Sequence, residues 1–94
     1  MKYKSFRDLQ VWQRSMSLAR EVYSLTAAFP RSETFGITNQ MRRAAVLVAS
    51  NRAEGHGRLT DKSFAFFLSQ ARGSLNELAT QLDLAVQLGF AEKD

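Results

Sequence analysis

Residues 60–89 read TDKSFAFFLSQARGSLNELATQLDLAVQLG, and this stretch decides the fold class. Its apolar residues return every three or four positions, which is the spacing of one face of an α-helix. They are Phe64, Phe67, Leu68, Ala71, Leu75, Leu78, Leu82, Ala85 and Val86. Thr60 is a suitable N-cap and Gly89 a suitable stop. The stretch therefore predicts a helix from about Asp61 to Leu88, roughly 40 Å long at about 1.5 Å per residue.

The preceding segment has the same period, and it predicts a helix over residues 33–54. Its apolar stripe consists of Ile37, Met41, Ala44 and Val48. Ser32 or Thr34 can cap its start, and Gly55 suits the left-handed residue that follows a helix end. We therefore expect residues 55–59 to form a tight turn between two antiparallel helices.

Residues 7–28 predict a further helix, which carries two apolar seams. The first seam is Leu9, Trp12, Met16, Ala19 and Tyr23, and the second is Val11, Leu18, Val22, Leu25 and Phe29. Two seams exceed the stripe of a simple surface helix. We interpret one seam as packing inside the subunit while the other meets a partner; burial of both in one core is the alternative. The expected subunit-interface residues are Val11, Leu18, Val22 and Leu25, with Phe66 and Leu84 from the third helix.

The whole chain reads as one all-α domain over residues 1–94. Alternating β-branched runs are absent, and the only proline, Pro30, falls where the first helix should end. Short connections favour an antiparallel up-down bundle of three long helices. Residues 90–94 are expected to be a connector. The longest apolar run, residues 44–49, is far below the roughly 20 residues of a membrane span, so no membrane contact is expected.

The charge balance points weakly to acidic partners. The formal net charge is +4, and nine of the thirteen basic residues are Arg, which favours bidentate contacts to carboxylate or phosphate. Residues 73–94 carry one basic and four acidic residues, so the basic charge lies in the front of the chain. Nucleic acid, an acidic protein partner and plain solvated surface charge all remain open. The absence of Cys fits a reducing, cytoplasmic location.

Nothing in the sequence predicts catalysis, a metal site or a cofactor. His56 is the single histidine, and an exposed turn explains it better than a ligand role. A Ser-His-Asp arrangement, a Glu-x-x-His pair and a phosphate-binding Gly-Lys-Ser/Thr motif are all missing. We therefore expect no catalytic residues, no bound metal and no cofactor, and a protein that acts by binding.

Polar residues on the second predicted helix suggest two further roles. Gln40, Arg43, Asn51 and Glu54 share a strip beside the apolar stripe, and we interpret them as a buried network that fixes helix register. In this interpretation, which we prefer to a ligand site, Arg43 and Glu54 pair with Glu77 or Arg72 of the third helix. The candidate nucleic-acid contacts are Arg42, Arg43, Arg52, Arg58 and Arg72. Arg42, Arg43 and Arg52 point in different directions on one helix, so a basic patch would need several helices or subunits to converge.

An ordered set of short segments covers nearly the whole chain and carries a family resemblance. In order they are Phe6-Arg7-Asp8-Leu9-x-Val11-Trp12-Gln13, Val22-Tyr23-x-Leu25-Thr26, Phe29-Pro30, Glu33-x-Phe35-Gly36-Ile37, Gln40-Met41-Arg42-Arg43-Ala44-Ala45, Asn51-Arg52-Ala53-Glu54-Gly55-His56-Gly57-Arg58, Phe64-x-x-Phe67-Leu68 and Ala71-Arg72-Gly73-Ser74-x-x-Glu77-Leu78. They resemble the bacterial four-helix-bundle proteins encoded by intervening sequences within 23S ribosomal RNA genes. They are similar also to the accessory protein of diversity-generating retroelements.

The resemblance implies a homo-oligomeric scaffold without enzymatic activity, typically a homopentameric ring with a central channel. It also implies nucleic-acid binding, RNA or DNA, because the retroelement relatives are basic and bind nucleic acid and a reverse transcriptase. Family members usually have a fourth helix, which these 94 residues do not include. In a three-helix variant, the third helix would leave an apolar groove for a protein partner to fill.

Overall fold

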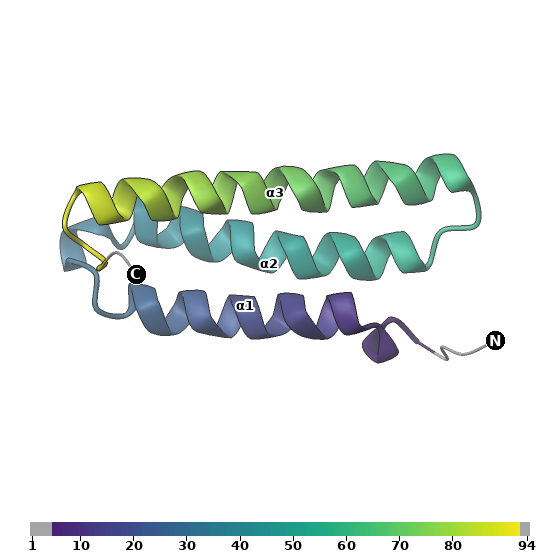
Figure 1. Cartoon of the computed structure of the whole chain (residues 1–94), viewed down its shortest axis with the longest axis horizontal. Coiled ribbons are helices and arrows are strands. Elements are labelled where there is room, and N and C mark those ends of the chain that lie inside the picture. The colour runs from purple at the N-terminus through teal and green to yellow at the C-terminus, as the bar shows by residue number, and fades with distance from the viewer. Residues whose placement is uncertain (1–4, 93–94) are drawn as a thin grey trace.

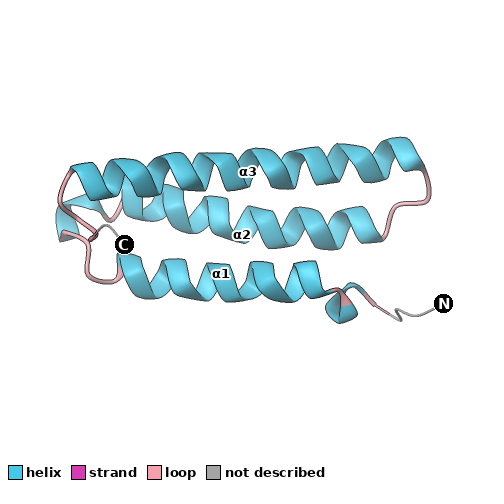
Figure 2. Ribbon diagram, viewed as in Figure 1, coloured by secondary structure: helices cyan, strands magenta, loops and turns pink. Residues whose placement is uncertain are grey.

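The structure, a computed structural model, describes residues 5–92 and places three long helices side by side (Figure 1). Their bounds are Gln10–Thr26 for α1, Ile37–His56 for α2 and Asp61–Gln87 for α3. Two short 3₁₀ helices, η1 at Phe6–Asp8 and η2 at Arg31–Glu33, precede α1 and α2. Successive long helices run in opposite directions, and the described residues form only helices and loops (Figure 2). The predicted all-α, antiparallel up-down bundle is confirmed.

Both ends of α3 are formed as the sequence predicts. The hydroxyl of Thr60 accepts a hydrogen bond from the Ser63 backbone N–H at 3.1 Å, which satisfies one free donor of the first turn. At the other end Gly89 has φ +81°, a left-handed conformation that suits glycine. The Gly89 and Phe90 N–H groups then bond back to the carbonyls of Val86 and Ala85. This is a Schellman motif, and it ends the helix.

Two glycine substitutions in this segment should change stability in opposite directions. We expect Gly89→Ala to lower the free energy of unfolding by about 1 kcal/mol, because an L side chain is strained at positive φ. Gly73→Ala should raise it by roughly 0.5–1 kcal/mol, because Gly73 lies inside α3 and an added Cβ meets no atom within 4 Å. Urea unfolding followed by circular dichroism measures both. Equal effects of the two variants would contradict this account.

The start of α2 differs from the prediction. Residues 31–33 form η2, and the backbone leaves the helical path at Gly36 (φ −109°, ψ −119°), so α2 begins at Ile37. The Thr34 hydroxyl donates to the carbonyl of Arg31 at 2.8 Å and therefore does not cap α2. The other predicted cap, Ser32, lies inside η2. The local hydrogen bonds of the segment after Pro30 thus form a separate turn, η2, and do not cap α2.

The end of α2 and the start of α1 also differ from the prediction. Gly55 is helical and buried, and α2 continues to His56. A Cβ at Gly55 would lie 3.3 Å from the Cβ of Phe67, so this glycine serves the close approach of α2 and α3. Residues 6–8 form η1, because the extended Leu9 (φ −76°, ψ 126°) separates them from α1.

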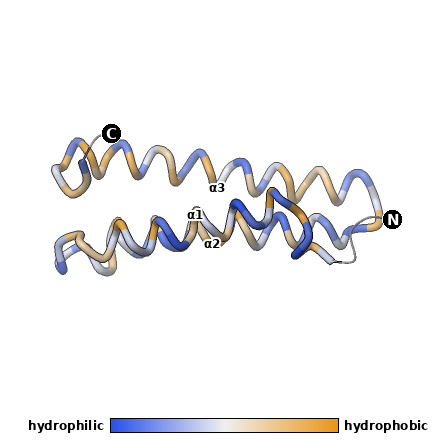
Figure 3. Tube along the Cα trace, turned by 60° about the horizontal axis from the view of Figure 1, so that its bottom comes forward, coloured by the Kyte–Doolittle hydropathy of each residue, from blue (hydrophilic) through white to orange (hydrophobic). Residues whose placement is uncertain are grey.

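The core lies along α2, which is the central helix. Within residues 5–92, α1 and α3 each pack against α2 and make no close backbone approach to one another. In the turned view of Figure 3, α1 and α2 overlap, and α3 lies apart from both. The core cluster consists of Val22, Phe29, Ile37, Met41, Ala44, Ala45, Leu78 and Ala85. Because the backbones of α1 and α3 stand apart, the bundle formed by residues 5–92 is open on the side between these two helices.

The first helix packs on α2 along the line between its two predicted seams. Ser15, Val22 and Thr26 are its buried residues. The Ser15 hydroxyl donates to the Val11 carbonyl at 2.7 Å, and that of Thr26 donates to the Val22 carbonyl at 2.7 Å. These intrahelical bonds satisfy the buried hydroxyls. Val22 therefore belongs to the core of the subunit and leaves little of its side chain exposed for a contact with a partner.

Phe90 and Ala91 join the core, which contradicts the prediction of a connector for these two residues. Phe90 packs against the core cluster, and its ring lies 5.7 Å from that of Phe29, measured between centroids. Residues 93–94 lie outside the described residues, as do residues 1–4, so the predicted domain is described over 5–92. The contact between Phe29 and Phe90 covers the end of the bundle at which both α1 and α3 end.

Candidate functional site: the groove between α1 and α3

Three adjoining hollows form one groove between α1 and α3, with α2 as its floor. They share residues: Leu18 lines the middle hollow and the hollow toward the end of α1, while Val11 and Arg52 line the middle hollow and the one toward the start of α1. The lining of this α1–α3 groove is Leu9, Val11, Arg14, Ser15, Leu18, Glu21, Val22, Leu25, Met41, Val48, Arg52, His56, Phe64, Leu68, Leu75, Leu78 and Leu82.

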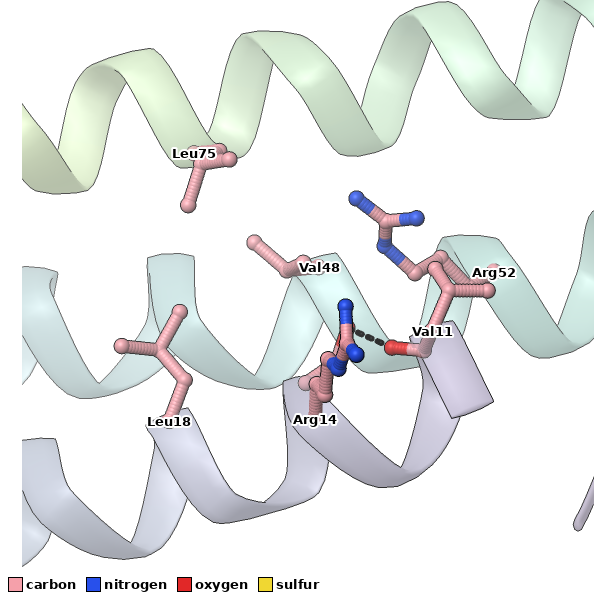
Figure 4. A pocket seen from close by; sticks show the side chains of 7 residues that line it. Val11, Arg14, Leu18, Val48, Arg52 and Leu75 are labelled. Carbon is pink, nitrogen blue, oxygen red and sulfur yellow. Dashed lines mark hydrogen bonds between the residues drawn. The ribbon is translucent and has the colours of Figure 1, made fainter. Parts of the chain in front are cut away.

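Each wall of the groove carries an apolar seam with a seven-residue spacing. The seam of α1 is Val11, Leu18 and Leu25, and the seam of α3 is Leu68, Leu75 and Leu82. Leu18 is half-buried, and the other five side chains are between 37% and 40% exposed. In Figure 4, Leu75 points down from α3 and Leu18 points up from α1, and Val48 of α2 lies at a height between them. A seven-residue repeat keeps apolar side chains on one seam against a neighbouring helix.

Charged groups divide the groove along its length. Arg14 and Arg52 line the middle hollow, and no acidic side chain of residues 5–92 lines it. The Nε of Arg52 is buried, and among the described residues no atom accepts a hydrogen bond from it. Glu21 lies one hollow further along α1. Because two guanidinium groups line the middle hollow, this hollow is suited to receive a carboxylate or another anion.

Two of the five predicted nucleic-acid contacts are engaged within the chain. Arg42 donates from Nε to the Thr26 hydroxyl at 2.8 Å and from Nη2 to the Tyr23 carbonyl at 3.3 Å, and it stacks on the Tyr23 ring. Arg42 thus links α2 to polar groups in the last turn of α1. Arg58 pairs with Glu54 and lies 4.4 Å from the centroid of the Phe67 ring.

The five predicted arginines do not converge on one face of a single chain. Arg42 stands near the start of α2, whereas Arg58 follows its end, and 20 helical residues span about 30 Å. Arg52 lines the groove, while Arg43 and Arg72 are exposed. A joint phosphate site would therefore need more than one copy of the chain.

The predicted polar network between α2 and α3 does not form. Gln40, Arg43, Glu54 and Glu77 are exposed and Asn51 is half-buried. Their bonds are local: Asn51 donates to the Leu47 carbonyl at 2.9 Å, Glu54 pairs with Arg58, and Glu77 accepts from Gln81 at 3.2 Å. The buried face of α2 is centred on Met41 and Val48, so the polar strip lies beside the contact and in water.

The structure also locates the single histidine and the remaining interface candidates. His56 is half-buried at one end of the groove, beside Leu9 and Phe64, and so is not the exposed turn residue that was expected. Phe66 and Leu84 are 55% and 47% exposed on α3, outside the groove. Over residues 5–92 no group of three His, Cys, Asp or Glu side chains is placed to hold a metal ion. No helix in this range is long and apolar enough to span a membrane.

The groove has a signal in the sequence that the interpretation above used only in part. The spacing of Val11, Leu18 and Leu25 predicts a contact surface on α1, and these three line the groove together with Val22, which makes four of the six predicted interface residues. The equivalent spacing of Leu68, Leu75 and Leu82 was assigned to the buried face of the third helix. Arg14 and Glu21 carry no signal of their own in the sequence, because periodicity alone does not show which seam stays open.

Comparison with known proteins gives one family match. Residues 7–94 match the family model described as 23S rRNA-intervening sequence protein. The matched range includes α1, α2, α3 and therefore every wall of the groove. A comparison with curated proteins gives no match.

Proposed function

This chain belongs to the 23S rRNA-intervening sequence protein family, and from that premise we propose that it is a non-enzymatic scaffold that holds a partner's amphipathic helix along the α1–α3 groove. The observation that carries the proposal is the pair of open apolar seams on the two walls of one groove. An amphipathic helix that lies in a groove is recognised through apolar anchors at helical spacing. The seven-residue period of both seams fits such an occupant.

The arrangement of apolar side chains in the groove favours a surface that binds a partner over a surface that stays in contact with water. Single exposed leucines are ordinary, but a contiguous apolar surface of more than a few hundred Å² is uncommon on proteins that stay monomeric. Six apolar side chains in register line this groove, and the charged Arg14 and Glu21 stand at its rim. An apolar strip with polar rims is the composition of a specific protein interface.

A titration with a model helix tests this proposal. The probe is a fluorescently labelled peptide of about three heptads with Leu at the a and d positions, and its control is a scrambled peptide of the same composition. We expect fluorescence anisotropy to show that the full chain binds the heptad peptide at least about tenfold more tightly than the scrambled peptide, a difference of about 1.4 kcal/mol. Equal affinity for both peptides would contradict the proposal.

A second candidate function, RNA binding by the same scaffold, is supported by the free arginines. Arg43 and Arg72 are exposed, and among the described residues neither guanidinium has a hydrogen-bond or ion-pair partner. The net charge of +4 favours a polyanion in addition. Because these arginines lie on different helices, this proposal requires an oligomer that brings several of them together.

Salt dependence distinguishes phosphate contacts from other binding. We expect Arg43→Gln and Arg72→Gln each to lower the slope of log affinity for RNA against log salt concentration by about 1. Arg58→Gln is the control, since Arg58 is already paired with Glu54, and should leave the slope nearly unchanged. Filter binding between low and high salt gives these slopes. Affinity that persists at high salt would argue against a phosphate-driven site.

We further propose that Phe66 and Leu84 contribute to a contact between subunits, as in the ring that the resemblance implies. Both side chains are exposed on α3, and Phe66 packs edge-on against Phe67 with 5.1 Å between ring centroids. Their position outside the groove supports a surface that is separate from it. A scaffold with two contact surfaces can join a ring and still hold a helix.

A further inference from the structure

We infer that the α1–α3 groove selects the partner's helix by charge as well as by shape, and that this helix carries an acidic side chain facing Arg14 and Arg52 and a basic side chain facing Glu21. The inference rests on the proposed function of the groove and adds the chemistry of the helix that it holds. Two features support it: layers of apolar side chains that fix the register of a bound helix, and opposite charges in successive intervals between these layers.

Apolar layers cross the groove and divide it into two intervals. Each layer pairs one side chain of the α1 seam with one side chain of the α3 seam. In order from the start of α1 the layers are Val11 with Leu68, Leu18 with Leu75, and Leu25 with Leu82. Successive layers are seven residues apart, which is about 10.5 Å along a helix. A bound helix with the same apolar spacing loses one layer of contacts if it slides by one heptad, so its register is fixed.

The interval between the first two layers is basic. Arg14 lies between the first and second layers on α1, and it lines the middle hollow together with Arg52 of α2. In Figure 4 the guanidinium groups of Arg14 and Arg52 both point up from their helices toward α3. Arg72 has the matching place on α3, between the first and second layers, and its side chain is exposed. Basic residues of all three helices thus border this interval.

The interval between the second and third layers has the opposite charge. Glu21 follows Arg14 by seven residues and therefore takes the equivalent place on α1. It lines the hollow toward the end of α1, which no basic side chain of the described residues lines. On α3 the equivalent place is taken by the uncharged Ala79, seven residues after Arg72. A helix whose acidic and basic side chains are about seven residues apart therefore matches both intervals.

Charges beside an apolar seam decide which helix binds and in which register. In coiled coils the positions that flank the seam carry charged residues that set partner choice and orientation. Opposite charges across an interface favour the complex and like charges disfavour it, and both effects grow as the groups lose contact with water. Within residues 5–92 neither Arg14 nor Glu21 has an ion-pair partner, so each can pair with a bound helix.

Peptides that differ at one position test the inference with the full chain. Each is a three-heptad helix with Leu at the a and d positions, and the flanking position between its first and second apolar layers is Glu, Gln or Lys. The chain variants are R14Q and E21Q. R20Q is the matched control for R14Q, because Arg20 is exposed on α1 and bonds to Ser17 outside the groove. Fluorescence anisotropy at low salt gives the affinities, and circular dichroism verifies that each variant is folded.

We expect the wild-type chain, R20Q and E21Q to bind the Glu peptide about fivefold more tightly than the Gln peptide, and R14Q to reduce this preference to about twofold or less. The Lys peptide should bind the wild-type chain about twofold more tightly than the Gln peptide, and E21Q should remove this preference.

Equal affinity of the wild-type chain for the Glu and Gln peptides overturns the inference. A preference for Glu that R14Q and R20Q reduce to the same extent also overturns it, because net charge would then be the cause. If all three peptides bind equally and more tightly than the scrambled peptide, the groove keeps its proposed function and only selection by charge is excluded.

Discussion

Met41→Ala should lower the free energy of unfolding by about 2–5 kcal/mol, the largest stability effect that we expect from a single substitution in this chain. Met41 is fully buried in the core cluster and lies on α2, the floor of the α1–α3 groove. Its removal leaves a cavity that the surrounding helices can fill only in part. Because domains of this size are stable by about 5–15 kcal/mol at most, much of the total would be lost.

Chemical unfolding followed by circular dichroism measures this effect, and Met16→Ala is the matched control. Met16 is half-buried in a hollow between α1 and α2, which it lines with Trp12 and Val46. The same truncation there should cost less than half as much, since fewer contacts are lost and water replaces them. Equal losses at the two positions would show that α2 is not the centre of the core.

Leu82→Glu should remove helix binding by the groove while the chain stays folded. Leu82 is 39% exposed, so a carboxylate at this position can remain in water in the free protein. In the complex the same carboxylate would be buried in a hollow that Glu21 lines and no basic side chain of the described residues lines, which costs about 2 kcal/mol or more, a loss of affinity of roughly 30-fold. Anisotropy with the heptad peptide gives the affinity.

Leu59→Glu is the control for this prediction, because Leu59 is 100% exposed and lies in the loop before α3, outside the groove. It makes the same change of side chain and charge without touching the binding surface. Its affinity for the peptide should match that of the wild-type chain. If the two variants weaken binding to the same extent, the effect comes from net charge and the groove is not the site.

Helical periodicity predicted the three helices and most of the core, but it could not predict how open the bundle is. All four residues of the predicted α2 stripe are buried, and the Thr60 and Gly89 ends of α3 are confirmed. Along α3, however, residues of one predicted face divide between the core and the groove: Leu78 is buried, whereas Leu75 and Leu82 are not. Periodicity shows which residues share a face, and the number of neighbouring helices decides how much of that face is covered.

Local hydrogen bonds and close helix packing account for the errors in predicting the two ends of α2 and the buried face of α1. Thr34 was predicted as a cap, but its hydroxyl donates within η2, an alternative that Ser and Thr always offer the backbone. Ser15 and Thr26 are buried against α2 because each hydroxyl bonds a carbonyl of its own helix. A glycine can end a helix or allow two helices to approach, and Gly55 does the second.

The arginines of the candidate site show the same limit. The composition shows how many arginines the chain has, but the role of each depends on its neighbours in the fold. Tyr23 and Thr26 bind Arg42. Glu54 pairs with Arg58, and the ring of Phe67 packs against it. Arg52 enters the groove only because α1 and α3 stand apart.

Site-specific photocrosslinking tests most directly whether the α1–α3 groove is the contact surface. A benzophenone side chain would replace Leu75 in one sample and Leu84, which lies outside the groove on the same helix, in another. Each full-length sample is irradiated with the heptad peptide, and mass spectrometry identifies the crosslinked partner. Our account predicts crosslinks from position 75 to the peptide, and none to the peptide from position 84. Peptide crosslinks from position 84 with none from position 75 would contradict it.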